Sequence, residues 1–369
     1  MKQKIVILGS TGSIGKQTLD IIKNNKKIFN VVLLSTNKNI KEISKQIKIF
    51  KPKFVIITNF RKFSYFKKKN KQIKFFNNYD CFKKIFHKKV DYVMSSISGF
   101  EGLQPTIEII KYTKSLAIAN KESIICGWSL IDKELKKNKT KFIPVDSEHF
   151  SIWSLINNKK ETIDEIYITA SGGPFLNRKR LSLKNIKPFH ATKHPRWKMG
   201  KKISIDSATM VNKVFEIIEA NKIFNLNFKK IKILSHPDSY VHAIVKFTNG
   251  ITKILIHETN MKIPIFNSLF ASKSAKIFSE KLNIKKLNNL NLNTISVKQF
   301  PALKIINLLN KNNNSLLETV LVSANDELVH LFLKNKIHFL DITEKLITIL
   351  KLNEFKILKS KKPNNLAQI

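Results

Sequence analysis

The sequence predicts an α/β protein with an N-terminal doubly wound, Rossmann-like parallel sheet domain, a central α+β domain and a C-terminal helical bundle. Three observations support this. The chain begins with a strand, a glycine-rich turn and a helix; strand and helix patterns alternate through the first third; and helical patterns alone follow residue 300. The predicted domains are residues 1–145, 146–284 and 300–369, with a linker over residues 285–299.

The composition is that of a folded protein of two or three domains, with 369 residues, 43% hydrophobic and 25% charged. Its formal net charge is +41. Nucleic-acid binding is one explanation. However, the lysines are spread along the whole chain beside many Ile, Asn and Phe residues, which favours a biased composition with Lys on solvated surfaces. We therefore expect no specific nucleic-acid partner.

The cysteines, Cys81 and Cys126, do not form a pattern typical of a disulfide framework or a thiolate metal site. Such usage indicates a reducing compartment, and we expect a cytoplasmic location. No run of about 18 apolar residues occurs, so we expect neither a transmembrane helix nor a membrane partner.

Gly9, Gly12 and Gly15 follow a predicted strand (residues 4–8) and precede a predicted helix (residues 16–23). Glycines in this place let backbone N–H groups approach a pyrophosphate at the positive end of the helix. A plain tight turn is the alternative, but the flanking strand and helix are the context that a dinucleotide site requires.

The second predicted strand, residues 31–34, is not followed by the acidic residue that binds the ribose of NAD. Lys38 lies there instead, which favours the 2′-phosphate of NADP. Asn120, Lys121 and Glu122 end a later strand, where ligand binding and helix capping are both open. The remaining strands of this parallel sheet are predicted at residues 54–57, 92–95 and 116–119, with the clearest helix at residues 102–111.

Asp146 and Glu148 follow a buried apolar strand that ends at Val145. In an extended backbone, residues two apart point to the same side, so both carboxylates can face one point. Hard oxygen ligands suit Mg²⁺ or Mn²⁺ rather than Zn²⁺. The alternative is a solvated turn in which Ser147 caps a helix over residues 148–156.

Ser171 and two glycines follow a predicted strand at residues 166–169 and form either an anion-binding backbone nest or a simple turn. The loop at residues 194–200 carries Trp197 and Met199 among cations. An exposed Trp and Met favour a lid over a phosphorylated substrate rather than a mobile surface loop.

Glu216 lies four residues after Asn212 and three after Lys213, so the three share one face of a helix predicted over residues 210–220. They are either a solvated ion pair or, with Ser207 at the start of the helix, part of a phosphate and metal site. Both interpretations remain open at this point.

The sequence around Asn249 and Gly250 predicts a β-hairpin, because this pair separates two alternating segments. An Asn- and Lys-rich stretch at residues 285–293 is typical of a linker, and residues 359–369 of a frayed tail. The predicted helices of the C-terminal bundle span residues 302–309, 316–324, 326–334 and 342–351.

Seven motifs occur in this order: GSTGSIG, ANKES, PVDSEH, SGGPF, HPRWKMG, KISIDSATMVNKVFE and HPDSYVHA. Together they closely resemble the 1-deoxy-D-xylulose-5-phosphate reductoisomerase family over almost the whole chain. The resemblance implies a homodimeric enzyme that depends on NADPH and a divalent metal, Mg²⁺ or Mn²⁺ with Co²⁺ as a further option. It would convert the phosphorylated sugar 1-deoxy-D-xylulose 5-phosphate to 2-C-methyl-D-erythritol 4-phosphate in the non-mevalonate isoprenoid pathway.

The resemblance also implies roles for single residues. The cofactor would contact Thr11, Gly12, Ser13, Ile14, Asn37, Lys38, Asn39, Asn120, Glu122 and Gly200. Asp146, Glu148 and Glu216 would hold the metal and, with Lys121 and His194, form the catalytic set. The substrate would be bound, beneath a lid carrying Trp197, by Lys121, Ser147, Glu148, Ser171, His194, Ser207, Asn212, Lys213 and Glu216.

Some positions depart from the family pattern. Val214 and Asn37 each stand where the family has glycine, and one later segment keeps only Glu258, Met261 and Pro264. The C-terminal helical region also ends before the family's last helix. Two other functions stay open: an NADPH-dependent reductase of another phosphorylated substrate, and a degenerate basic protein without catalysis.

Overall fold

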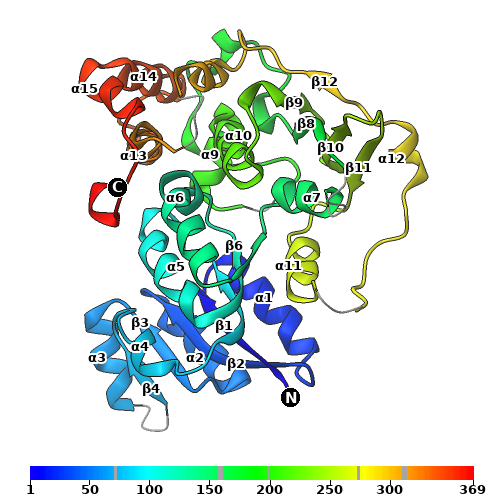
Figure 1. The fold of residues 1–369 in the computed structure, drawn as a ribbon. Helices are drawn as coiled ribbons and strands as arrows, with labels where there is room; N and C mark the ends of the chain where they lie inside the picture. Colours follow the sequence, from blue (N-terminus) through cyan, green and yellow to red (C-terminus); the bar gives the residue numbers. More distant parts are fainter. Residues whose placement is uncertain (70–72, 157–160, 198, 272–274, 310–313) are drawn as a thin grey trace. The chain divides into compact units, whose positions relative to one another are not determined.

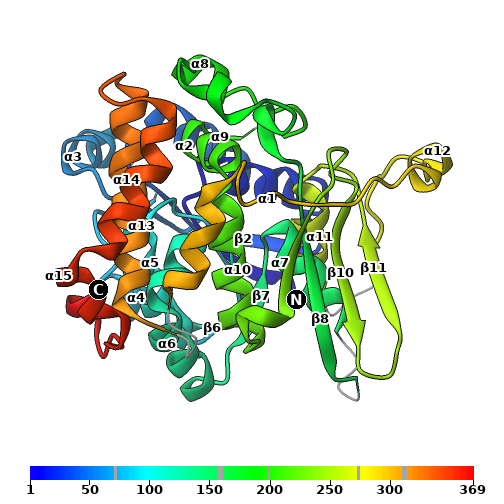
Figure 2. The ribbon, with the colours of Figure 1, turned by 90° about the horizontal axis from the view of Figure 1, so that it is seen from above.

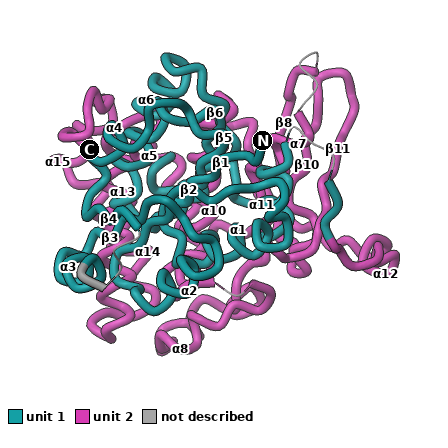
Figure 3. Tube along the Cα trace, turned by 90° about the horizontal axis from the view of Figure 1, so that it is seen from below, with its two compact units in different colours: residues 1–124, 129–146, 261–277 teal, residues 125–128, 147–260, 278–369 magenta. Residues whose placement is uncertain are grey.

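The computed structural model describes residues 1–69, 73–156, 161–197, 199–271, 275–309 and 314–369. The chain forms two compact units, each with its own sheet (Figures 1 and 3). Unit 1 comprises Met1–Ile124, Ser129–Asp146 and Met261–Ile277. Unit 2 comprises Ile125–Trp128, Ser147–Asn260 and Phe278–Ile369. Among the described residues, no helix combines the length and the hydropathy that a bilayer crossing needs.

Unit 1 contains a seven-stranded parallel sheet in the order β4-β3-β2-β1-β5-β6-β7, which confirms the predicted Rossmann-like fold. In β1, residues 5–8 are all fully buried, as expected for a central strand covered on both faces. The chain leaves β1 in one direction along the sheet and returns at β5, so ligands are expected at the carboxyl ends of these two strands. The strands are β1 (Gln3–Leu8), β2 (Phe29–Thr36), β3 (Phe54–Ile57), β4 (Lys74–Phe76), β5 (Val90–Ser95), β6 (Thr113–Ile118) and β7 (Lys141–Pro144).

Helices connect these strands, and one further helix joins unit 1 from far along the chain. This helix, α11 (Lys262–Leu269), packs beside α1 (Figure 1). Ser268 Oγ lies 2.7 Å from Tyr92 Oη of β5, so a segment that the sequence analysis groups with the central domain packs in unit 1. The connecting helices are α1 (Ser13–Asn24), α2 (Ile40–Phe50), α3 (Phe60–Lys69), α4 (Phe82–Ile85), α5 (Leu103–Ile109) and α6 (Lys121–Lys137).

Unit 2 contains a five-stranded mixed sheet in the order β11-β10-β8-β9-β12, in which only β8 and β9 are parallel. The predicted hairpin is confirmed as β10 and β11, and Gly250 between them has a φ of 86°. Helix α7 (Ser147–Leu155) packs against β10 (Figure 2). The strands are β8 (Ile163–Ala170), β9 (Ile231–Ser235), β10 (Val241–Phe247), β11 (Thr252–Ile256) and β12 (Asn293–Thr294).

The C-terminal part of unit 2 is helical, as predicted, and its helices α13 and α14 pack side by side (Figures 1 and 2). α9 was not predicted; Gly200 begins it, and Met210, with a φ of 65°, separates it from α10. The helices are α8 (Pro188–Ala191), α9 (Lys201–Thr209), α10 (Val211–Phe224), α12 (Ile284–Asn288), α13 (Leu316–Leu333), α14 (Phe339–Lys351) and α15 (Asn353–Lys356).

Several predictions for the C-terminal region were wrong. One helix, α13, replaces the two predicted, because the Asn325 side chain bonds to Asp206 instead of competing with the helix backbone. The stretch Pro301–Leu308 is a 3₁₀ helix, and the predicted linker carries α12 and β12. The predicted frayed tail is attached at Lys361, whose carbonyl oxygen accepts a hydrogen bond from the Leu316 N–H (2.9 Å).

Candidate active site

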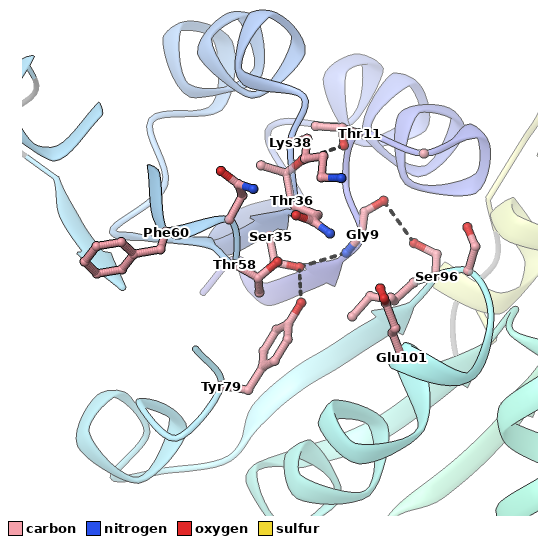
Figure 4. A pocket seen from close by; sticks show the side chains of 15 residues that line it. Gly9, Thr11, Ser35, Thr36, Lys38, Thr58, Phe60, Tyr79, Ser96 and Glu101 are labelled. Carbon is pink, nitrogen blue, oxygen red and sulfur yellow. Dashed lines mark hydrogen bonds between the residues drawn. The ribbon is translucent and has the colours of Figure 1, made fainter. Parts of the chain in front are cut away.

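A cavity of about 720 Å³ lies at the carboxyl ends of the strands of unit 1 (Figure 4). Four residues predicted to bind the cofactor line it together. Thr11 and Gly12 come from the turn after β1, and Asn37 and Lys38 from the loop after β2. The cavity therefore joins the glycine turn and the cation that were expected to hold a dinucleotide.

The glycines of this turn are required by close backbone packing. Gly9 has a φ of 79°, and a Cβ there would lie 2.6 Å from the Ser96 carbonyl oxygen. A Cβ on Gly15 would lie 2.5 Å from the Ser10 Cα. Only glycine permits this approach of helix α1 to the strand ends.

Six other predicted cofactor residues lie outside the cavity lining in the part of the chain that the structure describes: Ser13, Ile14, Asn39, Asn120, Glu122 and Gly200. Three of them, Asn39, Asn120 and Gly200, are N-cap residues of helices, which confirms the capping interpretation of Asn120; Asn39 and Asn120 cap with their side chains. The side chain of Asn39 accepts a hydrogen bond from the Glu42 N–H (3.1 Å), and that of Asn120 from the Ser123 N–H (3.0 Å). Asn120 also donates to the Gly99 carbonyl oxygen (2.7 Å).

The sequence analysis missed several polar residues of this cavity, among them Ser35, Thr58, Tyr79 and Ser96 (Figure 4). Burial raises the pKa of Tyr79 to about 12, and its hydroxyl lies 3.4 Å from Ser35 Oγ. Three of these residues could have been found from the sequence, because Ser35, Thr58 and Ser96 lie at or just after the carboxyl ends of parallel strands, where ligands bind in this fold.

Asp146, Glu148 and Glu216 form a group whose carboxylate oxygens lie within 4.8 Å of one another. Asp146 follows β7, and Ser147 begins α7. The carboxylates of Asp146 and Glu148 therefore meet at a strand–helix junction, and not along one extended strand as the sequence argument assumed. Lys121 pairs with Asp146 at 3.0 Å. Three hard oxygen donors this close together fit the ligand preference of Mg²⁺ or Mn²⁺.

The ammonium group of Lys213 pairs with both Glu148 and Glu216, and the amide of Asn212 donates to Glu216. Lys213 and Glu216 are buried. Burial alone would lower the pKa of Lys213, but the two carboxylates raise it above its usual value. The Lys–Glu pair of α10 is therefore buried and part of the carboxylate group, not a solvated surface pair.

His149 and Glu219 are functional candidates that the sequence analysis missed. Both are buried, and with Asp146 they form a second group of possible metal ligands. His149 Nε2 lies 2.8 Å from the backbone carbonyl oxygen of Glu216. The available signals were the place of His149 directly after Glu148 and that of Glu219 one helical turn after Glu216.

Ser171 and His194 meet in unit 2, with Ser171 Oγ 2.9 Å from His194 Nε2. The Gly173 N–H also donates to Ser171 Oγ (3.2 Å). His194 Nδ1 accepts hydrogen bonds from the backbone N–H groups of Arg196 (3.2 Å) and Trp197 (2.9 Å). Burial, and then the charge of Lys213, lower the pKa of His194 to about 4.

The Ser171 loop packs directly on the end of α9, where Ser207 lies. Gly172 and Gly173 have φ values of 81° and 63°, which favour glycine. A Cβ on Gly173 would lie 3.0 Å from the Ala208 Cα and 3.1 Å from the Ser207 carbonyl oxygen. The structure thus brings the glycine turn and Ser207 together, although Ser207 lies in the last turn of α9 and not at the start of a new helix.

The loop predicted as a lid is anchored on one side. Arg196 pairs with Asp238 (2.6 Å), and the Trp197 ring meets the His242 ring edge to face, with centroids 6.1 Å apart. Trp197 and Met199 are half-buried rather than exposed as predicted, because Trp197 packs on His242. Lys198 of the same loop lies outside the described residues.

Profiles of known families match most of the chain. The profile described as 1-deoxy-D-xylulose 5-phosphate reductoisomerase matches residues 5–127. Its C-terminal domain profile matches residues 142–224, and a further DXP reductoisomerase C-terminal domain matches residues 256–369.

Curated relatives and solved structures have the same description. The 1-deoxy-D-xylulose 5-phosphate reductoisomerase of Pelagibacter ubique is 58% identical over 372 aligned residues, which cover 100% of this chain and 96% of the relative. That of Clostridium kluyveri is 38% identical, with 92% and 90% covered. The Zymomonas mobilis enzyme in complex with NADPH has a TM-score of 0.89 at 31% identity, covering 100% of this chain and 95% of that one. A structure with NADPH, fosmidomycin and magnesium also has a TM-score of 0.89, at 28% identity, with 97% and 91% covered.

Proposed function

Because the chain belongs to the 1-deoxy-D-xylulose 5-phosphate reductoisomerase family, whose activity depends on NADPH and a metal, we propose how its residues divide the work of rearranging and reducing 1-deoxy-D-xylulose 5-phosphate. The observation that carries the proposal is the group of three carboxylates, Asp146, Glu148 and Glu216, with Lys213 among them.

In this proposal Asp146, Glu148 and Glu216 hold Mg²⁺ or Mn²⁺, with Co²⁺ as a further option. The bound cation supplies Lewis-acid polarisation of the substrate's carbonyl and adjacent hydroxyl oxygens. Lys121, held at Asp146, and Ser147, at the start of α7, contact the same part of the substrate.

Ser171, His194, Ser207, Asn212 and Lys213 bind the substrate phosphate. Two N–H groups donate to His194 Nδ1, so the neutral imidazole carries its proton on Nε2 and donates it to Ser171. Because the Gly173 N–H donates to the same oxygen, the hydroxyl proton of Ser171 is left for a phosphate oxygen. Binding energy at the phosphate then orients the distant reacting carbons.

The cavity in unit 1 holds NADPH, with Thr11, Gly12, Ser13 and Ile14 at the pyrophosphate and Asn37, Lys38 and Asn39 near the 2′-phosphate. Asn120, Glu122 and Gly200 also contact the cofactor in this proposal. A comparison of kcat/KM with NADPH and NADH tests the assignment of Lys38, because equal values would remove the reason for a 2′-phosphate site.

The loop that carries Trp197 closes over the substrate and excludes water from the reduction step. The Arg196–Asp238 ion pair supports this role, because it fixes one side of the loop to the turn before β10.

The quaternary state, the location and the domain borders are also part of the proposal. We propose a homodimer in the cytoplasm, and the free Cys81 and Cys126 thiols support a reducing compartment. Three domains with borders near residues 145, 285 and 299 stay a prediction; the change of family profile between residues 127 and 142 is consistent with the first border, whereas the third profile already begins at residue 256. Sedimentation equilibrium tests the dimer, and a single species with the 42.6 kDa mass of one chain would contradict it.

The direct test is NADPH oxidation with 1-deoxy-D-xylulose 5-phosphate, measured after chelation and again after Mg²⁺ or Mn²⁺ is added back. We expect metal-dependent turnover to 2-C-methyl-D-erythritol 4-phosphate. Oxidation only with another phosphorylated substrate would indicate a different reductase. The absence of turnover with every metal would indicate a degenerate protein.

A further inference from the structure

Helix α13 makes two buried polar contacts with the helices that carry the proposed phosphate and metal ligands. Lys222 of α10 pairs with Glu318 of α13 at 2.6 Å, with both side chains 1% exposed. Asn325 of α13 donates to Asp206 of α9 over 2.8 Å, and both are buried. Glu318 and Asn325 are seven residues apart, two helical turns, and so lie on one face of α13.

Each contact lies close in sequence to a proposed ligand. Asp206 directly precedes Ser207, and Lys222 lies six residues after Glu216, about 9 Å along the helix at 1.5 Å per residue. The backbone of α10 also carries Asn212 and Lys213. A rotation or shift of α10 would therefore move two phosphate ligands and the metal carboxylate together, and a shift of α9 would move Ser207.

The stability of the fold does not explain these contacts. Removing two charges from water costs as much as a buried pair returns, and apolar replacements of such pairs are often neutral or stabilising. A buried pair specifies the relative position of the two helices that it joins. Glu318 is itself held in place, because it also accepts a hydrogen bond from the Ser315 N–H (3.2 Å) at the start of α13. Lys222 is held as well by Asn314 (3.0 Å).

We infer that Asp206–Asn325 and Lys222–Glu318 are positioning pairs, through which α13 sets the register of α9 and α10 at the active site. Residues on α13 need not touch the substrate or the cofactor to do this. The inference rests on the proposed roles of Ser207 and Glu216. A displacement of about 1 Å at such ligands can lower turnover about 100-fold, so small changes at α13 have large effects.

The test is a residue swap at the first pair. Asn325→Asp leaves two buried carboxylates facing each other, whereas Asp206→Asn removes the charge but keeps an amide oxygen that accepts from Asn325. The double variant restores an amide–carboxylate bond in the opposite sense. Lys202 lies 3.3 Å from Asp206 and 2.8 Å from Asp326, so it is placed to balance a carboxylate on either helix.

We expect Asn325→Asp to raise the KM for 1-deoxy-D-xylulose 5-phosphate and the Mn²⁺ concentration for half-maximal activity at least about tenfold, and Asp206→Asn to change both less, with NADPH affinity unchanged in each. The double variant should return both to within about threefold of the parent protein. An Asn325→Asp variant with a lower Tm but unchanged KM and Mn²⁺ dependence would overturn the inference, as would a double variant no better than Asn325→Asp.

A second variant covers the case in which the single variants fail to fold. Lys222→Met with Glu318→Leu removes the other pair without leaving a buried charge, so the fold should persist. We expect a weaker Mn²⁺ response and a lower kcat, whereas parent-like values would contradict the inference. Glu344→Gln is the control, because Glu344 pairs with Arg180 at a solvated position (56% exposed) and should change neither. A parent protein without activity would instead refute the proposed function.

Discussion

At the scale of single residues, Lys213 relieves the repulsion between two carboxylates. Its ammonium group pairs with Glu148 and Glu216 inside the protein. In the proposed site, a divalent cation bound by the same oxygens would compete with Lys213, whose ammonium group would then turn to the substrate phosphate. The proposal therefore links metal binding to phosphate binding through this side chain.

Lys213→Met tests this link. Without substrate, Mn²⁺ should bind more tightly than to the parent protein, because the competing cation is gone. The KM for 1-deoxy-D-xylulose 5-phosphate should rise about tenfold or more through the lost phosphate contact. Calorimetric Mn²⁺ titration and steady-state kinetics measure the two effects. Lys246→Met, which removes a solvated pair with Asp164, is the control; weaker Mn²⁺ binding by Lys213→Met would contradict the link.

His194 should stay neutral well below the usual pKa of histidine. Its pKa of about 4 means that the unfolded chain binds more protons than the folded one between pH 6.5 and 4. The contribution of His194 to stability is therefore complete above pH 6.5 and is lost as the pH falls through 4. Ring-proton NMR should show a titration midpoint near 4, and a midpoint near 6.5 would contradict the burial of the ring and the acceptor role of Nδ1. In Lys213→Met the midpoint should move upward.

Sequence reasoning at this scale named the three carboxylates and Lys213 but not His149 or Glu219. The carboxylates were accessible because local spacing and a family resemblance both pointed to them. The contact of His149 with the Glu216 backbone joins residues 67 positions apart. Its place directly after Glu148 was a local signal, but that position alone does not distinguish His149 from other buried histidines.

At the scale of elements, the turn after β8 is shaped by its packing on α9. Gly173→Ala should raise the KM for 1-deoxy-D-xylulose 5-phosphate, because a Cβ pressed against Ala208 displaces the turn that carries Ser171. Gly250→Ala is the matched control. Its φ is 86°, but nothing lies within 4 Å of the added Cβ. Both should lose about 1–2 kcal/mol of stability from the left-handed conformation, measured by urea unfolding. An unchanged KM in Gly173→Ala would contradict the proposal that this turn is part of the substrate site.

Element prediction succeeded where local chemistry decides structure. The β10–β11 hairpin follows from Asn249–Gly250, and the parallel sheet from its alternating apolar strands. Prediction failed where contacts between residues distant in sequence decide where a helix begins and ends. α9 has little apolar periodicity, and α13 continues through Asn325 because Asp206, 119 residues away in sequence, satisfies its side chain.

At the scale of the whole molecule, the net charge of +41 needs no nucleic-acid partner to explain it. The lysines lie throughout the sequence, not in one basic segment. In a gel shift at physiological salt, we expect no duplex DNA binding at the nanomolar level of specific complexes. Weak binding that disappears as salt rises is the expected behaviour of unspecific charge. A nanomolar complex at physiological salt would contradict this account.

The central claim is that Asp146, Glu148 and Glu216 together hold the catalytic metal. Parallel Mn²⁺ and NADPH titrations of Glu216→Gln test it most directly, because this change removes one charge and one good ligand while it keeps the shape. We predict a fall in kcat of about 100-fold or more, since metal polarisation is worth several kcal/mol. Mn²⁺ affinity should weaken and NADPH affinity should stay near that of the parent, because the proposed cofactor cavity belongs to unit 1. Parent-like turnover and Mn²⁺ affinity in this variant would contradict the three-carboxylate site.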